Sequence, residues 1–244
     1  MRRSAKCASV RAVHAESGAM PQDPAKTPPP AAPEPLPPPP PEAVARFAPD
    51  ILKRLNDYGQ QLATAGVIRG LIGPREVPRL WDRHLLNCAA LAEAIGEKET
   101  VADIGTGAGL PGLVVALVRP DLRVILIEPL ERRCVFLQEM VKRFQLAPRV
   151  EVRRGKAHMV KPANADVVTS RAVAALDTLA GWSFPHLKVG GRLLALKGDR
   201  ADEELAAAKN ELAKWGAEAE ATVITCGTDW LPQPIKVVRA PRRR

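Results

Sequence analysis

The sequence has few of the features that mark secreted, metal-binding or membrane-spanning proteins. Its 244 residues include four cysteines, which are far apart and form no Cys-x-x-Cys pair. Neither a zinc site nor a disulfide framework is indicated, and reduced thiols in a cytosol fit this pattern. No apolar run approaches the roughly 20 residues that a membrane helix needs, and the start has no apolar stretch of the secretory type. We expect a cytoplasmic chain without a membrane span or a metal site.

The first 42 residues differ in composition from the rest. They hold 12 of the 24 prolines, including the runs at 28–30 and 37–41. Such a segment buries little apolar area and builds no hydrogen-bonded ladder, so a disordered or polyproline-like tail is expected over 1–42. Residues 43–244 are expected to fold as one domain, with helices over 43–98 and an α/β core over 99–240.

The folded part carries most of the basic excess. The formal net charge is +9 and the pI is near 9.7. The tail has five basic and four acidic residues, so 31 basic and 23 acidic residues remain for the folded part. A positive balance favours a polyanionic partner, of which nucleic acid is the commonest, although net charge also serves solubility.

A glycine-rich turn separates a strand-like run from a helix-like run at residues 101–118. The apolar run contains an acid, Asp103, and is followed by Gly105, Gly107 and Gly109. Glycine suits such a turn because it adopts positive φ and has no Cβ to keep a ligand from the backbone. The segment is therefore a candidate nucleotide-binding loop.

The glycines alone do not decide the nucleotide. The segment 107–112 also fits the dinucleotide pattern, with Glu128 about 20 residues on, so an NAD-linked oxidoreductase stays open. Two details favour S-adenosylmethionine (SAM). The carboxylate of Asp103 attracts a cationic amino-acid group and repels a pyrophosphate. Pro111 and Gly112 also make the loop longer than a turn that sets a helix N-terminus on a phosphate.

Hydrophobic periodicity predicts two N-terminal helices followed by alternating strands and helices. The two helices are expected over 44–62 and 76–95, with apolar residues at three- and four-residue spacing. Seven strands are expected at 101–104, 123–127, 150–153, 165–169, 192–196, 221–226 and 235–239, and further helices at 113–118, 131–144, 175–187 and 201–215. This alternation predicts an α/β fold with a mostly parallel sheet between helices, whose ligands bind beyond the carboxyl ends of the strands.

Basic residues recur at four-residue spacing in the second helical segment. Arg75, Arg79 and Arg83 would form one stripe on a regular helix, able to follow phosphates or simply to face solvent. His84 falls among the apolar positions, where a hydrogen-bonded, partly buried histidine is more common than a catalyst.

The predicted strand ends supply the remaining candidates. Glu128 can accept hydrogen bonds from the ribose hydroxyls of an adenosine. The turn at Ala157 and His158 either reads an adenine edge or is an ordinary loop. Arg171 and Lys197 end adjacent strands and can hold a cofactor carboxylate or substrate phosphates, unless they merely cap the strands.

Two motifs common in methyltransferases are missing. Enzymes that methylate an exocyclic amine usually have an Asp- or Asn-Pro-Pro-aromatic motif after the fourth strand, and those that attack a pyrimidine carbon use Pro-Cys. Neither occurs in the chain. Guanine N7 has a lone pair and no proton, so its methylation needs proximity and alignment without a general base. The pattern suits such an acceptor.

Four motifs together resemble one family. They are Leu80–Asn87, Asp103–Gly112, Thr169–Ala172 and Ala195–Gly198. In order and spacing they resemble the bacterial 16S ribosomal RNA (guanine(527)-N7)-methyltransferase G family, also called glucose-inhibited division protein B. Ile72–Glu76 and Val173–Asp177 are similar to its actinobacterial branch, and the resemblance covers about residues 44–240.

The resemblance implies a Rossmann-like class I SAM-dependent methyltransferase with an N-terminal helical cover. Its substrate would be 16S rRNA or the small ribosomal subunit. The implied cofactor-binding residues are Asp103, Gly105, Gly107, Gly109, Leu110, Glu128, Ala157, His158 and Arg171. Arg171 and Lys197 would be catalytic, and Arg75, Arg79, Arg83 and His84 would face the RNA.

Two features depart from the family pattern. A glutamate is common in the family where His158 stands, and the proline-rich head is not part of the pattern. The sequence leaves open a small-molecule methyltransferase and a non-catalytic RNA-binding protein with this fold. It says nothing of the oligomeric state, for which we expect a monomer.

Overall fold

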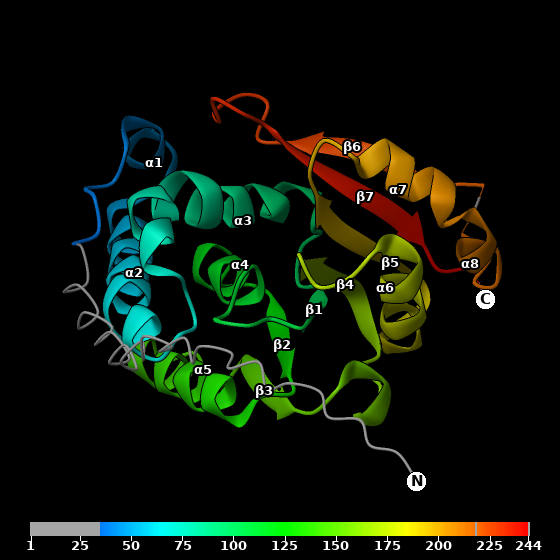
Figure 1. Cartoon of the computed structure of the whole chain (residues 1–244), viewed down its shortest axis with the longest axis horizontal. Coiled ribbons are helices and arrows are strands. Elements are labelled where there is room, and N and C mark those ends of the chain that lie inside the picture. The colour runs from blue at the N-terminus through cyan, green and yellow to red at the C-terminus, as the bar shows by residue number, and fades with distance from the viewer. Residues whose placement is uncertain (1–34, 218, 244) are drawn as a thin grey trace, which may run out of the picture. The chain divides into compact units, whose positions relative to one another are not determined.

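The computed structural model describes residues 35–217 and 219–243 of the chain (Figure 1). Seven strands form one sheet in the order β3-β2-β1-β4-β5-β7-β6. β7 is the one reversed strand of this sheet and pairs antiparallel with both β5 and β6, whereas the other pairings are parallel. The strands are β1 (Thr100–Ile104), β2 (Arg123–Glu128), β3 (Val150–Arg154), β4 (Ala165–Arg171), β5 (Leu187–Lys197), β6 (Thr222–Cys226) and β7 (Ile235–Pro241). The predicted mostly parallel seven-stranded sheet is confirmed.

Helices cover both faces of the sheet. Successive residues of a strand point to opposite faces, so each strand has apolar side chains to bury on both sides. Val101 packs into one hydrophobic cluster and its neighbour Ala102 into the other. The first cluster includes residues of α2, α4 and α5, and the second residues of α6, α7 and α8 (Figure 1). The core helices are α4 (Gly112–Val118), α5 (Glu131–Arg143), α6 (Leu176–Ser183), α7 (Ala201–Ala207) and α8 (Lys209–Ala213).

The N-terminal helices are more broken than the periodicity predicts. The expected helix at 44–62 is two helices, α1 (Pro41–Arg46) and α2 (Pro49–Gln61), followed by a π-helical turn, η1 (Leu62–Gly66). Phe47 and Ala48 between them are extended, with ψ of 141° and 150°. A residue that precedes proline is disfavoured in the helical region, so Pro49 breaks the first helix and begins the second.

The second expected helix, 76–95, is also interrupted. It consists of a 3-10 turn η2 (Pro74–Arg79), a π-helical stretch η3 (Leu80–Leu86), α3 (Asn87–Ala90) and a second 3-10 turn η4 (Leu91–Ala94). Pro78 lies inside the first turn and has no N–H to donate to an α-helical ladder. The apolar spacing correctly indicates the buried side, but the segment is not one α-helix.

The predicted tail at 1–42 lies mostly outside the described residues. From residue 35 the chain packs against the helices. Leu36 is buried in the first hydrophobic cluster, and the carbonyl of Pro37 accepts a hydrogen bond from Trp81 Nε1 at 3.1 Å. Residues 36 and 37 therefore contact the N-terminal helices.

The register brings the predicted strand ends to one edge of the sheet. Glu128 pairs with Arg154 on β3, Asp103 with Thr169 on β4, and Arg171 with Leu196 on β5. The carboxyl ends of β1, β2, β4 and β5 therefore share an edge, where open α/β sheets bind ligands. Within the described residues no helix is long and apolar enough to span a membrane, and no group of three or more His, Cys, Asp or Glu side chains could hold a metal ion.

Candidate active site

The glycine-rich turn connects β1 to α4 through left-handed backbone. Gly105, Gly107 and Gly109 have φ values of 66°, 61° and 106°, which other residues rarely adopt. A Cβ on Gly109 would come within 2.8 Å of the Tyr58 hydroxyl, whereas one on Gly107 would meet only a backbone oxygen at 3.9 Å. Gly109 is thus required for packing, and Gly107 leaves the backbone open to a ligand.

Asp103 lies beneath this turn. Its side chain is fully buried, and its Oδ2 accepts a hydrogen bond from the amide of Gly112 at 2.8 Å. Burial raises the pKa of Asp103 to about 7, because removal from water disfavours the charged carboxylate.

Glu128 fastens the turn to the end of β2. Only 1% of this residue is exposed, and its Oε2 accepts the amide N–H of Gly107 at 3.0 Å. Its Oε1 accepts the amide of Leu130 at 2.9 Å. Both oxygens therefore hold the backbone, and the expected contact with ribose hydroxyls stays a prediction.

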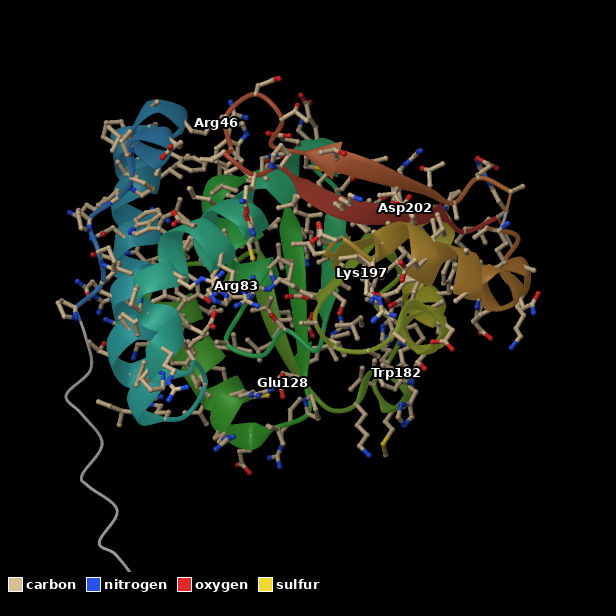
Figure 2. All side chains as sticks on the ribbon, turned by 45° about the horizontal axis from the view of Figure 1, so that its top comes forward. Arg46, Arg83, Glu128, Trp182, Lys197 and Asp202 are labelled. Atoms are coloured by element: carbon tan, nitrogen blue, oxygen red, sulfur yellow. The ribbon has the colours of Figure 1, made fainter. Side chains whose placement is uncertain are left out.

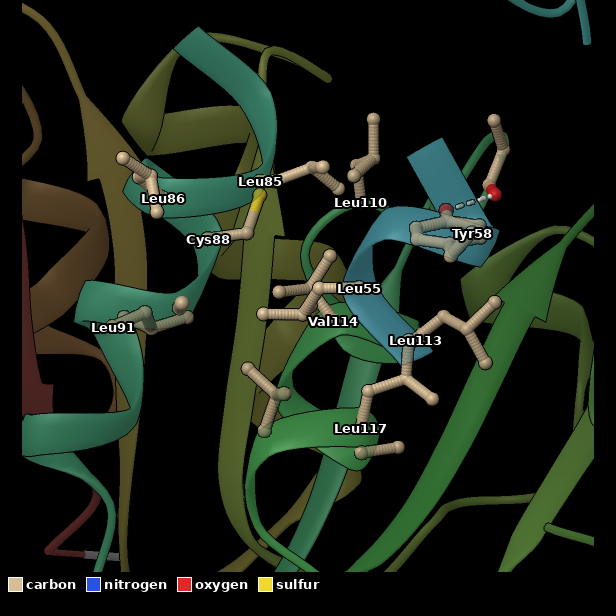
Figure 3. Packing of buried hydrophobic residues seen from close by; sticks show 14 of the residues in the cluster. Leu55, Tyr58, Leu85, Leu86, Cys88, Leu91, Leu110, Leu113, Val114 and Leu117 are labelled. Carbon is tan, nitrogen blue, oxygen red and sulfur yellow. Dashed lines mark hydrogen bonds between the residues drawn. The ribbon is translucent and has the colours of Figure 1, made fainter. Parts of the chain in front are cut away.

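Of the other predicted cofactor residues, Leu110 belongs to the turn segment, and Ala157 and His158 follow β3. Ala157 begins the 3-10 turn η5 (Ala157–Met159), and its carbonyl accepts a hydrogen bond from His186 Nε2 at 2.8 Å. His158 is exposed, whereas Leu110 is buried in the cluster that includes Tyr58 and Leu85 (Figure 3). A buried Leu110 side chain leaves its backbone as the part able to reach a cofactor.

A cavity of about 750 Å³ opens beside the turn, at the carboxyl ends of β4 and β5. It brings together Arg171 and Lys197, which the sequence places at adjacent strand ends, and adds His84, but its lining includes neither the glycine turn nor Glu128. Its charged lining residues are the cations Arg83, Arg171, Lys197 and Arg200 and the acids Glu76 and Glu204. Arg83 and Lys197 reach it from the N-terminal helices and from β5 (Figure 2). This balance is net positive and suits an anionic ligand.

Arg171 is held on two sides within the cavity wall. Its Nη1 donates to the carbonyl of Arg83 at 3.0 Å, and its Nη2 lies 2.5 Å from His84 Nδ1. His84 Nε2 in turn lies 2.7 Å from Glu76 Oε2. Burial, reinforced by the Arg171 charge, lowers the pKa of His84 to about 4. His84 is thus a buried, hydrogen-bonded, neutral histidine, as its place among apolar residues indicates.

Lys197 is likewise engaged. Its Nζ donates to the carbonyl of Ala174 at 2.9 Å and pairs with Glu204 Oε2 at 2.7 Å. Its side chain is 9% exposed. The ammonium is therefore fixed at the cavity wall.

The three arginines of the predicted stripe are exposed but do not follow one regular helix. Arg75 and Arg79 lie in the 3-10 turn η2, and Arg83 lies in the π-helical η3. Four residues make more than one full turn of the 3-10 helix η2 and less than one full turn of the π-helix η3. The three arginines therefore do not line up, and the predicted stripe on one regular helix is wrong. Arg83 is also paired with Glu76 at 3.3 Å. Their contact with RNA stays a prediction.

Three functional candidates were missed by sequence reasoning. Glu76 and Glu204 have no sequence signal that places them at the cavity, and Tyr58 fits the apolar pattern of α2. Tyr58 is the only tyrosine of the chain, and a polar hydroxyl in a buried helix face is the one signal that a specific hydrogen bond was needed there.

The fold and the edge residues define the class of protein. A seven-stranded sheet with one reversed strand, a glycine-rich turn after β1 and an acid at the end of β2 characterise a class I SAM-dependent methyltransferase. M. jannaschii TYW2 in complex with AdoMet has the same fold, with a TM-score of 0.51 and 20% identity over 67% of this chain and 78% of that one.

Sequence comparisons give the family. The family model described as rRNA small subunit methyltransferase G, GidB, matches residues 51–229. The Ribosomal RNA small subunit methyltransferase G of Kineococcus radiotolerans is 52% identical over 84% of this chain and 82% of its own length. That of Mycolicibacterium paratuberculosis is 48% identical over 92% of this chain and 91% of its own. The chain belongs to the rRNA small subunit methyltransferase G family, and its cofactor is SAM.

Proposed function

We propose that this chain methylates N7 of guanine 527 in 16S rRNA, with the small ribosomal subunit or its RNA as substrate. The observation that carries the proposal is the cavity at the ends of β4 and β5. Four cations and two acids face it, and it adjoins the glycine turn of a methyltransferase fold. The family membership supports ribosomal RNA as the acceptor.

The residues of the turn fit the cofactor. SAM supplies a methyl group on a sulfonium, which makes a neutral nitrogen lone pair a sufficient acceptor. Gly107 leaves the backbone accessible at the carboxyl end of β1 and is fixed by Glu128 through its amide, whereas Gly105 supplies left-handed backbone and lies against Val173. The Asp103 carboxylate beneath the turn favours a cationic group above it. Leu110 would contribute through its backbone, and Ala157 and His158 lie at the end of β3 for the adenine side.

The cavity side chains suit an acceptor that needs no deprotonation. His84 Nδ1 is occupied by Arg171, and the pKa of His84 is lowered to about 4, so its imidazole is a poor general base. Guanine N7 carries no proton, so the chain has only to position the base and hold its backbone. Arg171 and Lys197 are the groups that would do this, through charge-assisted hydrogen bonds to RNA.

A small-molecule methyltransferase is less well supported. Four cations exceed what a single small acceptor needs, and Arg75 and Arg79 extend exposed positive charge beyond the cavity. Neutralising several phosphates is the usual source of RNA affinity. We further propose that the chain acts as a monomer in the cytoplasm, where small subunits are assembled.

The test uses the full chain with labelled SAM. Unmodified 16S rRNA and unmodified small subunits are incubated separately, and 7-methylguanosine is mapped by primer extension after chemical cleavage. We expect incorporation at guanine 527 and none in a matched RNA with adenine at that position. No incorporation into either substrate, despite saturable binding of S-adenosylhomocysteine, would overturn the RNA assignment.

A further inference from the structure

Three charged or polar side chains from two distant parts of the chain form one hydrogen-bonded row at the cavity wall. Glu76 is in η2, His84 in η3 and Arg171 at the end of β4. The Glu76 Oε2 to His84 Nε2 distance is 2.7 Å, and the His84 Nδ1 to Arg171 Nη2 distance is 2.5 Å. The row links the N-terminal helices to the sheet.

The chemistry of the row permits only one arrangement of protons. A guanidinium can donate but cannot accept, so His84 Nδ1 must accept from Arg171. The neutral imidazole then carries its proton on Nε2 and donates it to the Glu76 carboxylate. Both ring nitrogens are satisfied, and the ring plane is fixed at both ends.

Arg171 is left with a defined set of free donors. The guanidinium has five N–H groups, of which one is bound by the Arg83 carbonyl and one by His84. No further hydrogen bond of this guanidinium is made to the described residues, and Arg171 lines the cavity. The remaining N–H groups therefore stay available to a ligand.

We propose that Glu76 is a positioning residue, which acts through His84 to fix the Arg171 guanidinium for an anionic group of the RNA substrate. An unanchored arginine side chain has several rotatable bonds, and the entropy lost when a ligand orders it weakens binding. Two anchors order it in advance, as a preorganised site requires. The role of Arg171 in this inference rests on the function proposed above.

Glu76 also lines the cavity, so the experiment must separate an indirect role from direct contact with RNA. Three variants of the full chain form a cycle: Glu76→Ala, His84→Asn and the double variant. The shorter side chain introduced by His84→Asn keeps an acceptor for Arg171 but cannot bridge to Glu76. If the effect of Glu76 passes through His84, removal of Glu76 should cost little in the His84→Asn variant.

In the otherwise unchanged chain, Glu76→Ala should lower kcat for 16S RNA methylation by about tenfold to a hundredfold, the cost of a misplaced group. The KM for SAM should stay within about twofold if Arg171 faces the RNA, whereas a larger rise would assign Arg171 to the cofactor, as the resemblance also implies, and would overturn the inference. Glu76→Gln, whose amide oxygen still accepts from Nε2–H, should recover most of the loss. Glu139→Ala on α5, which removes an exposed ion pair to Arg69, is the matched control.

A spectroscopic measurement decides the point independently of activity. The Nη signals of Arg171 should be separate in the unaltered chain, where two are hydrogen-bonded, and should average in Glu76→Ala. Equal losses of kcat from Glu76→Ala with and without the His84→Asn substitution, or unchanged Arg171 signals, would overturn the inference.

If the unaltered chain methylates no 16S RNA, the proposed function fails, and the Arg171 signals still test the row. If Glu76→Ala does not fold, His84→Asn takes its place as the variant that breaks the link to Glu76, and Glu76→Gln serves as the variant that keeps it. Equal kcat and equal Arg171 signals in these two variants would then overturn the inference.

Discussion

The hydroxyl of Tyr58 donates a hydrogen bond to the carbonyl of Ala108 at 2.7 Å (Figure 3). Tyr58 lies on α2 and Ala108 in the glycine turn, so this bond joins the N-terminal helices to the cofactor loop. The side chain is completely buried, and its ring packs edge-on against Phe144 with centroids 6.4 Å apart. The helical cover thus supports the loop directly.

Tyr58→Phe should weaken this support while it keeps the ring packing. The buried carbonyl of Ala108 loses its partner, which costs about 1–3 kcal/mol of unfolding free energy. We expect a lower melting temperature and several-fold weaker S-adenosylhomocysteine binding, measured by calorimetry. Unchanged binding in a destabilised variant would show that the bond serves the fold alone.

Two alanine substitutions in the turn should have different consequences. Gly109→Ala places a Cβ at 2.8 Å from the Tyr58 hydroxyl and 2.9 Å from Leu113 Cβ, whereas Gly107→Ala meets nothing closer than 3.9 Å. Both pay about 1–2 kcal/mol for the left-handed backbone. Gly109→Ala should therefore destabilise the fold clearly more in urea titrations, and Gly107→Ala should mainly weaken cofactor binding. The reverse order would contradict the assigned roles.

Much of this arrangement could be predicted from the sequence because it depends on local patterns. The glycines at 105, 107 and 109 require a turn, and apolar strands alternating with helices require a sheet covered on both faces. Since carboxyl ends of parallel strands meet at one edge, the proximity of Arg171 and Lys197 followed without a structure.

The remainder depended on geometry that periodicity does not encode. Pro49 and Pro78 each interrupt a helix that the apolar spacing predicts as continuous. With η2 and η3 wound differently from an α-helix, Glu76 came to bond His84 across eight residues of chain. The four-residue spacing of the arginines therefore predicted correctly that they are exposed, but its prediction that they line up on one helix face was wrong.

Cofactor binding and stability should respond oppositely to pH because of Asp103. Burial raises its pKa from 3.8 to about 7. The folded state then holds a proton that the unfolded state has lost, so this group's stabilising contribution is present below pH 3.8 and is lost as pH rises through about 7. Binding of a cationic cofactor should instead strengthen over the same rise. Asp103→Asn should remove both trends in chemical denaturation and binding titrations, and their persistence would assign them to another group.

RNA binding should depend on the exposed arginines of η2 and η3 through charge, even though they form no straight stripe. Arg75→Ala with Arg79→Ala removes two exposed cations, and the slope of log K against log salt should flatten by up to about two units if both contact phosphates. Arg79→Ala with Arg83→Ala should flatten the slope by less than two units, because Arg83 is partly neutralised by Glu76 at 3.3 Å.

Lys142→Ala with Arg143→Ala, in the last turn of α5, is the matched control with two exposed cations. Filter binding of 16S RNA over a salt series gives the slopes, and an equal slope for the η2 pair and the control would show that the arginines merely face solvent.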